Sequence, residues 1–266
     1  MTKGQETSQG GVEGPVKLSS VLVEIVLLWL VANLVIRAVV QLHSALALPD
    51  VVLAVIPFVF IYAPVALCWL RGVDSYRYPL YVPGFRDTRA WLDAFKSSMK
   101  WFVVLLVPWI VGYHIWMTMS CDVVEGALDS TGWFSYVNIC PDVDFGFRLT
   151  SSIFTVIAFQ VFFVAIPEEF FYRGYIQTRL SEVLPNRGEL IGVGYGAGLW
   201  ITALLFAFGH SLVTFQWWHF AIFFPGILFG LLREKTGGVL APAFLHAACN
   251  VGVVVLDVTY GVRNLI

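Results

Sequence analysis

The stretch Thr150–Gln177, "TSSIFTVIAFQVFFVAIPEEFFYRGYIQ", decides what kind of fold this chain adopts. Its first part, as far as Ile166, is an apolar run long enough for a membrane-spanning helix. Two adjacent carboxylates and an arginine follow at once, although ionised side chains are costly at membrane depth. We therefore expect Glu168, Glu169 and Arg173 to serve a function within a membrane-embedded helix.

The composition of the whole chain supports a membrane protein. Of 266 residues, 58% are hydrophobic and only 13% are charged, whereas a soluble domain carries about 25% charged residues. The aromatic share of 16%, with ten tryptophans, fits rings anchored at two membrane interfaces. We predict an all-α, polytopic transmembrane helical bundle of about seven (six to eight) spans in contact with the lipid bilayer. The net charge of −2 and the lack of a basic run give no indication of a nucleic-acid partner.

Seven apolar runs are long enough to span a membrane. They are Leu18–Ile36, Val51–Leu70, Trp101–Met119, Thr150–Ile166, Ile191–Gly209, Leu212–Leu232 and Val239–Val255. We expect a polar, disordered amino-terminal tail (1–17) without a cleavable signal peptide, followed by amino-terminal transmembrane helices and loops (18–147). A catalytic transmembrane core (148–258) and a short carboxy-terminal tail (259–266) complete the expected organisation.

The loop charges predict the orientation. Six basic residues and three acidic ones separate the second and third runs: Arg71, Arg77, Arg86, Arg89, Lys96 and Lys100 against Asp74, Asp87 and Asp93. The next loop carries five acidic residues, Asp122, Glu125, Asp129, Asp142 and Asp144, and one basic residue, Arg148, next to the fourth run. By the positive-inside rule the first loop is cytoplasmic, and so are the amino terminus, Arg179–Arg187 and Arg233–Lys235. We expect a multi-pass protein of the bacterial inner (plasma) membrane.

Cysteines and glycines add smaller expectations. Cys121 and Cys140 lie in the loop expected outside, where they form either a disulfide or two free thiols. Cys68 and Cys249 lie within apolar runs and are interpreted as packing residues. The glycines of "GVGYGAG", Gly192–Gly198, are expected to open the fifth span and to permit close helix packing.

Helical geometry separates the roles of the two glutamates. At 100° per residue, Arg173 lies about 40° around the axis from Glu169 and about 140° from Glu168. Glu169 and Arg173 therefore form an i,i+4 ion pair with the acid on the amino-terminal side, the favoured order. Glu168 is left without a local cation, which suits a general base. The alternative is that all three charges cap the cytoplasmic end of a helix in the headgroup region.

Two further patterns supply histidines and an asparagine. "FAFGH" places Phe206 four residues before His210, and "HAACN" places His246 and Asn250 on one helical face. Two convergent donors in a dry site make an oxyanion hole. Alternatively, His246 and Asn250 hold helices together by hydrogen bonds, and His210 is an interface histidine. His219, beside two tryptophans, is interpreted as an interface histidine.

Three motifs in this order resemble the CAAX-processing and bacteriocin-processing (CPBP, formerly Abi) family of intramembrane proteases. The family motifs E-E-x-x-x-R, F-x-x-x-H and H-x-x-x-N read here "EEFFYR", "FAFGH" and "HAACN" without departure. The resemblance covers about the last hundred and ten residues. It implies a glutamate-dependent endopeptidase without metal or other cofactor, acting on a protein or peptide substrate at the membrane. Glu168 would activate water with help from His210, and His246 and Asn250 would form the oxyanion hole. Glu169, Arg173 and Phe206 would shape the site.

Three other functions remain open on the sequence. Glu168, His210 and His246 provide enough ligands for catalytic zinc, although there is no H-E-x-x-H helix. Cys249 provides a thiol for a thiol protease, although little in its span would lower its pKa. A non-enzymatic membrane scaffold or immunity-type peptide-binding protein could also carry these motifs. The substrate class stays open: a prenylated CaaX protein, a carboxy-terminal sorting tail or a bacteriocin.

The depth of the site in the membrane sets one more expectation. Counted as simple spans, Glu168 falls at the inner end of one helix and His210 at the outer end of the next, about 30 Å apart. A shared site cannot have this separation. We therefore predict one long fourth helix, from about Thr150 to beyond Leu180.

Overall fold

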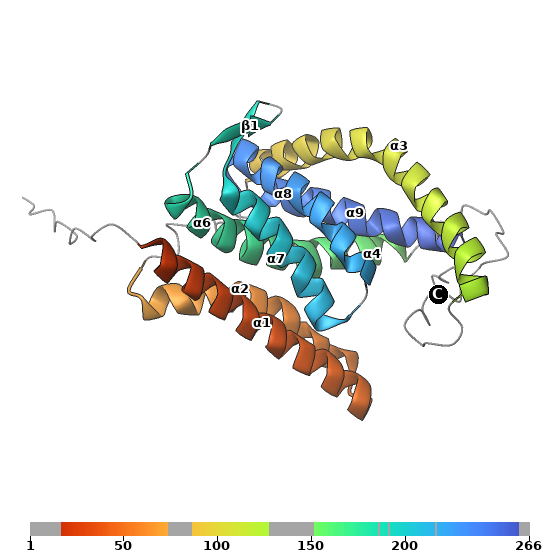
Figure 1. Ribbon diagram of the computed structural model, residues 1–266, viewed down its shortest axis with the longest axis horizontal. Coiled ribbons are helices and arrows are strands. Elements are labelled where there is room, and N and C mark those ends of the chain that lie inside the picture. Colours follow the sequence, from red (N-terminus) through yellow and green to blue (C-terminus); the bar gives the residue numbers. More distant parts are fainter. Residues whose placement is uncertain are drawn as a thin grey trace, which may run out of the picture.

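The computed structural model describes residues 17–73, 87–127, 152–185, 187–190, 192–215 and 217–260. In these residues the protein is all-α except for one short hairpin, as the composition predicts (Figure 1). Seven helical segments are present: α1 (Leu18–Leu46), η1–α2 (Asp50–Ala54, Val55–Leu70), α3 (Thr88–Ala127), the α4–α6 run (Ile153–Val183), α7 (Ala197–Val213), η5–α8 (Trp217–Ile222, Phe223–Thr236) and α9 (Leu240–Thr259). By length and composition, five of them can cross a membrane: α1, η1–α2, α3, the α4–α6 run and α9.

The predicted long fourth helix is present. It runs unbroken for 31 residues and consists of α4 (Ile153–Phe159), η3 (Gln160–Ala165), α5 (Ile166–Glu169), η4 (Phe170–Gln177) and α6 (Thr178–Val183). In η3 and η4 the turns are widened to π-helix, so that Ile166 N–H bonds to the Val161 carbonyl, five residues back. Pro167 lies two residues after the end of the first widened stretch, and a proline ring clashes with the carbonyl four residues back in a regular helix. The wider turns keep the helix continuous past Pro167 and carry Glu168 to its middle.

The predicted fifth span begins too early in the sequence. Residues Val193–Tyr195 form strand β2, which pairs antiparallel with β1 (Gly188–Leu190), and helix α7 begins only at Ala197. Gly192 has φ +72° and Gly196 is extended, so the glycines form a turn and a strand exit before the helix. The packing role expected of these glycines holds for Gly198, whose added Cβ would lie 3.0 Å from the Leu180 Cβ.

The predicted sixth span, Leu212–Leu232, is wrong as a single helix. Helix α7 ends at Val213, and Thr214 has the extended backbone angles φ −134° and ψ 110°. A 3₁₀ segment, η5, then leads into α8, which begins at Phe223. The third span was predicted too short, because α3 continues for 40 residues through parts of both flanking loops. The residues of the Cys121–Cys140 prediction lie outside those whose side chains the structure describes.

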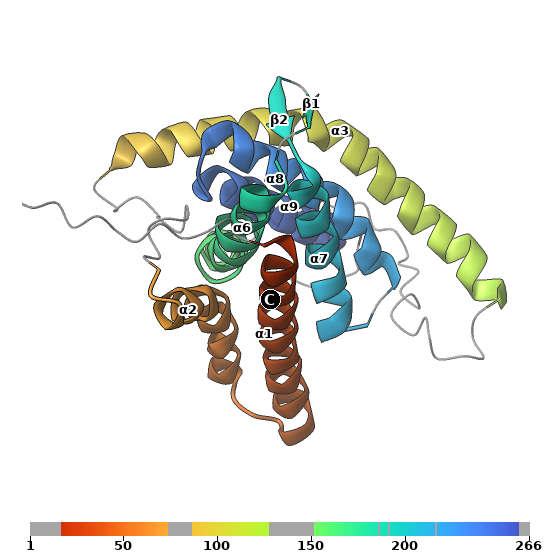
Figure 2. The same cartoon turned by 60° about the vertical axis from the view of Figure 1, so that its left-hand side comes forward.

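The helices form two groups around the long run. Helices α1 and α2 lie side by side on one side of the molecule, and α3 arches over α8 and α9 on the opposite side (Figures 1 and 2). Helix α1 follows α7 closely, because Trp29 Nε1 donates to the Leu205 carbonyl over 3.0 Å and Arg37 Nη1 to the Leu212 carbonyl over 2.6 Å. Helix α1 is therefore hydrogen-bonded directly to the helix that carries His210.

A cluster of charges binds α1 and α2 to the long run as well. Glu24 on α1 accepts hydrogen bonds from Tyr175 Oη (2.6 Å), Arg179 Nε (3.2 Å) and Arg71 Nη1 (3.2 Å). Hydrogen bonds between ionised groups are stronger than those between neutral ones. They fix α1 and the end of α2 against the half of the run that follows Glu168.

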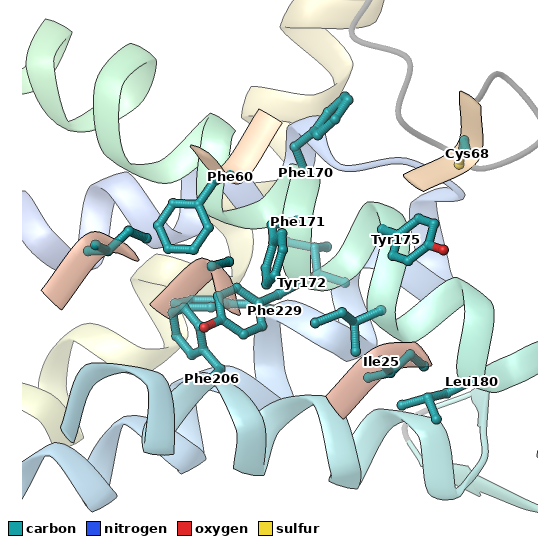
Figure 3. Packing of buried hydrophobic residues seen from close by; sticks show 14 of the residues in the cluster. Ile25, Phe60, Cys68, Phe170, Phe171, Tyr172, Tyr175, Leu180, Phe206 and Phe229 are labelled. Atoms are coloured by element: carbon teal, nitrogen blue, oxygen red, sulfur yellow. The ribbon is translucent and has the colours of Figure 1, made fainter. Parts of the chain in front are cut away.

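An aromatic core surrounds the middle of the long run. Phe171 and Tyr172 lie between Phe60 of α2 and Phe206 of α7, with Phe229 of α8 behind them (Figure 3). Rings from four helices thus meet beside the two glutamates. Cys68 is buried in this core and Cys249 packs against it, as the packing interpretation predicts.

Candidate active site

Glu168 faces two histidines from two other helices. Its Oε2 atom lies 3.9 Å from Nε2 of His210 on α7 and 4.0 Å from Nε2 of His246 on α9. Oε2 is buried and accepts no hydrogen bond from any described residue. Both separations are too long for a direct hydrogen bond, and one water molecule between the groups can reach both atoms. The structure therefore brings together three residues that lie 42 and 36 positions apart along the chain.

The backbone of its own helix orients His210. Nδ1 lies 2.9 Å from the Phe206 carbonyl, and because a carbonyl can only accept, Nδ1 carries the proton. In the neutral ring Nε2 then has the lone pair and faces Glu168. The Phe206 ring packs edge-on against the imidazole at 4.8 Å between centroids. The F-x-x-x-H spacing therefore has two local functions, since residue 206 fixes the tautomer through its carbonyl and the ring position through its side chain.

Glu169 orients His246. Nδ1 of His246 donates to Glu169 Oε1 over 3.0 Å, so Nε2 is directed to Glu168. Phe229 stacks on the imidazole at 4.9 Å between centroids, with 18° between the planes, and Phe206 meets it edge-on. Both histidines thus present Nε2 to the same carboxylate. The two adjacent glutamates have different partners, as the helix angles predict.

Arg173 is the buried counter-ion of Glu169. Its Nη1 donates to Glu169 Oε1 over 2.8 Å, and both side chains have 0% exposure. Nη2 donates to the Gly226 carbonyl over 3.0 Å, and the guanidinium lies 4.3 Å from the centre of the Phe206 ring. A buried charge is tolerated only when it is paired and hydrogen-bonded. The predicted i,i+4 pair is present, and it lies in the interior next to His246.

Glycines on α8 allow the long run to approach closely. Gly226 and Gly230 lie one turn apart, and their carbonyls accept from Arg173 Nη2 and Gln177 Nε2 over 3.0 and 3.1 Å. A Cβ at residue 230 would lie 2.8 Å from Gln177 Oε1. These contacts were missed from the sequence, although "GILFG" has the small-x-x-x-small spacing of close helix packing.

Gly209, inside the F-x-x-x-H motif, gives a stability prediction. A Cβ there would overlap the Tyr172 hydroxyl and lie 2.9 Å from Asn33 Oδ1, and both side chains are buried. Gly209→Ala is expected to lower the free energy of unfolding by about 1–3 kcal/mol through overpacking. Thermal unfolding in detergent, followed by tryptophan fluorescence, measures the effect. Gly112→Ala on α3 is the control, because a Cβ there meets nothing within 4 Å. Equal stability of the two variants would contradict the prediction.

Asn250 lies one turn after His246 on α9 but bonds to a different helix. Its Nδ2 donates over 2.9 Å to Oε1 of Gln160, the first residue of η3. Sequence reasoning missed Gln160. A usable signal was present, since Gln160 is the one strongly polar side chain in the apolar stretch between Thr155 and Glu168.

His219, which the sequence analysis interpreted as an interface histidine, lies near the site. The His219 ring contacts the His210 ring at 5.9 Å between centroids, so it borders the site on the α7 side. Exposure decreases from His210 (31%) through Glu168 (14%) to His246 (5%), which makes His210 and Glu168 the accessible side. Among the described residues, no group of three or more His, Cys, Asp and Glu side chains is arranged to hold a metal ion.

Comparison with known proteins gave one match, to a protein-family model, in the second half of the chain. Residues 150–252 match the family model described as "Type II CAAX prenyl endopeptidase Rce1-like". Neither the curated proteins nor the solved structures compared with the chain gave a match. The matched residues include the α4–α6 run, α7, α8 and the first part of α9, and therefore all three motifs. The resemblance predicted from those motifs is thus confirmed: residues 150–252 are similar to the type II CAAX prenyl endopeptidases of the CPBP family.

Proposed function

We propose that this protein is an intramembrane endopeptidase that cleaves a peptide bond near the carboxy terminus of a membrane-associated or lipidated protein. The observation that carries the proposal is the approach of both histidine Nε2 atoms to one buried carboxylate oxygen, Oε2 of Glu168. A carboxylate between two imidazoles can bind, orient and deprotonate a water molecule. The family match supports proteolysis in general, and the assignment of single residues is our proposal.

The first chemical step belongs to Glu168 and His210. Glu168 takes a proton from the bound water as the water oxygen forms a bond to the substrate carbonyl carbon. Nε2 of His210, whose lone pair faces the same place, accepts a hydrogen bond from the water and orients it. Protonated Glu168 then gives its proton to the leaving amide nitrogen, and the carbon–nitrogen bond breaks. The carboxylate is regenerated without any further reactant.

His246 and Asn250 stabilise the tetrahedral oxyanion in this proposal. They lie one turn apart on α9, so an oxygen above that face can receive a hydrogen bond from each. To donate, Nε2 of His246 must carry a proton while Nδ1 donates to Glu169. Arg173 already neutralises Glu169, so the Glu168 carboxylate, and then the oxyanion itself, balances the charge on His246. Such preorganised donors are often the largest single contribution to catalysis.

Asn250→Ala tests the oxyanion assignment. It is expected to lower turnover of a farnesylated, internally quenched peptide ending in a CaaX sequence by about 10²–10³. Thermal unfolding should change little, because the substitution removes a single side-chain hydrogen bond, that to the half-buried Gln160. Unchanged turnover would remove Asn250 from the mechanism.

Two further measurements on the same purified protein separate the other enzyme classes. We expect a chelator to leave the activity unchanged, and we expect Cys249→Ala to retain it, because Cys249 packs against the aromatic core. Loss of activity on chelation, restored by zinc, would indicate a metalloprotease. Loss of activity in Cys249→Ala with normal folding would indicate a thiol enzyme.

A further inference from the structure

The Asn250 amide is held by a residue outside the three motifs. Asn250 Nδ2 donates to Gln160 Oε1 over 2.9 Å, and this contact connects α9 with the long run 90 residues earlier in the sequence. Gln160 lies on the same continuous helix as Glu168. Glu168 and Asn250 are both proposed to act on the substrate carbonyl. The helix that carries Glu168 therefore also carries the residue that holds Asn250.

The contact with Gln160 leaves one N–H donor of the Asn250 amide available for another acceptor. The nitrogen of an asparagine side chain carries two N–H donors. Gln160 accepts one of them, and the other remains for a different acceptor. The last torsion of an asparagine side chain is broad, so an amide without a partner rotates freely. With one N–H held by Gln160, the second N–H has a fixed direction before substrate arrives, as an oxyanion donor requires.

The widened turns of the helix explain why Gln160 can reach this position. In a regular α-helix, eight residues would place Gln160 about 80° around the axis from Glu168. The π-helical turns of η3, Gln160–Ala165, rotate by less per residue and bring Gln160 toward the Glu168 face. The distortion at Pro167 thus aligns both residues with α9.

We propose that Gln160 is a positioning residue that orients Asn250 for oxyanion stabilisation. This inference rests on the proposed function and extends it to a residue that the motifs do not include. The competing role is a hydrogen bond between helices that contributes to stability alone. If Gln160 positions Asn250, its loss lowers the turnover number. If Gln160 only stabilises the helix contact, its loss lowers the unfolding temperature alone.

The first experiment measures the contact without any substrate. Asparagine side chains labelled with ¹⁵N give amide resonances in detergent, and the one missing in Asn250→Ala belongs to Asn250. Gln160→Met removes the acceptor at nearly constant length and is expected to shift that resonance. Gln160→Glu keeps a side-chain oxygen in place and is expected to preserve it. An unchanged Asn250 resonance in Gln160→Met would overturn the contact.

The second experiment measures kcat and KM with the farnesylated CaaX peptide. Gln160→Met is expected to lower kcat by about 10–10² with little change in KM, because a donor misplaced by about 1 Å loses up to this factor. Gln160→Glu is expected to recover most of the activity. The control, Gln41→Met, makes the same chemical change on the exposed part of α1 and is expected to leave kcat unchanged.

A double-mutant cycle decides whether Gln160 acts through Asn250. In an Asn250→Ala background, Gln160→Met is expected to cause no further loss, because the group that it orients is already gone. Additive losses, or a lowered unfolding temperature with kcat unchanged, would overturn the positioning role. If Asn250→Ala is impaired and Gln160→Met is not, this inference alone fails. If Asn250→Ala has full activity, the oxyanion assignment of the proposed function fails as well.

Discussion

Replacing Glu168 with glutamine is expected to lower the rate of peptide cleavage by about 10²–10⁴ and to leave the fold intact. Glutamine has the same shape as glutamate but cannot take the proton from water. Oε2 of Glu168 accepts no hydrogen bond from a described residue, so the substitution breaks no direct hydrogen bond of that atom in the described part of the chain. The measurements are the cleavage rate in detergent, thermal unfolding and monodispersity of the purified variant.

Glu189→Gln is the matched control for this experiment. Glu189 is exposed on strand β1, so the same loss of a carboxylate there should change neither cleavage nor stability. Normal cleavage by Glu168→Gln would overturn the protease mechanism. If the biological function also persisted in that variant, a peptide-binding membrane scaffold would become the better description of the protein.

Arg173→Ala is expected to lower the free energy of unfolding by about 3–5 kcal/mol and the abundance of the protein with it. The substitution leaves the Glu169 carboxylate buried without its counter-ion, and it removes the donor to the Gly226 carbonyl. It also removes the cation from the face of the Phe206 ring, which packs against both histidines. Activity should fall together with stability, because the same contacts position the catalytic groups.

Two comparisons make the Arg173 prediction specific. Arg187→Ala removes an exposed arginine close to the hairpin and is expected to leave stability unchanged. Arg173→Met combined with Glu169→Gln removes both charges and is expected to regain part of the lost stability, because no uncompensated charge remains. A stable, normally abundant Arg173→Ala protein that lacks only turnover would contradict the structural role and would indicate a direct one in catalysis.

The fold class and the contacts within single helices of the candidate site were predictable from the residues alone. Apolar runs of membrane-spanning length leave few alternatives to helices, because only hydrogen bonds within the segment satisfy the backbone in lipid. Contacts one helical turn apart were also accessible, since side chains four residues apart lie close together on one face of a helix. The Glu169–Arg173 pair, the opposite direction of Glu168 and the Phe206–His210 contact are all of this kind.

The contacts between groups on different helices could be identified only in the three-dimensional arrangement of those helices. Gln160 beside Asn250, Phe229 stacked on His246, and the carbonyls of Gly226 and Gly230 facing the long run are contacts of this kind. Such contacts depend on the tilt and register of whole helices, which the sum of many packing interactions sets and no local pattern encodes. The hairpin before α7 and the widened turns at Pro167 were missed for a related reason. Hydropathy records how apolar a segment is, whereas backbone geometry at glycine and proline decides where a helix begins, widens or ends.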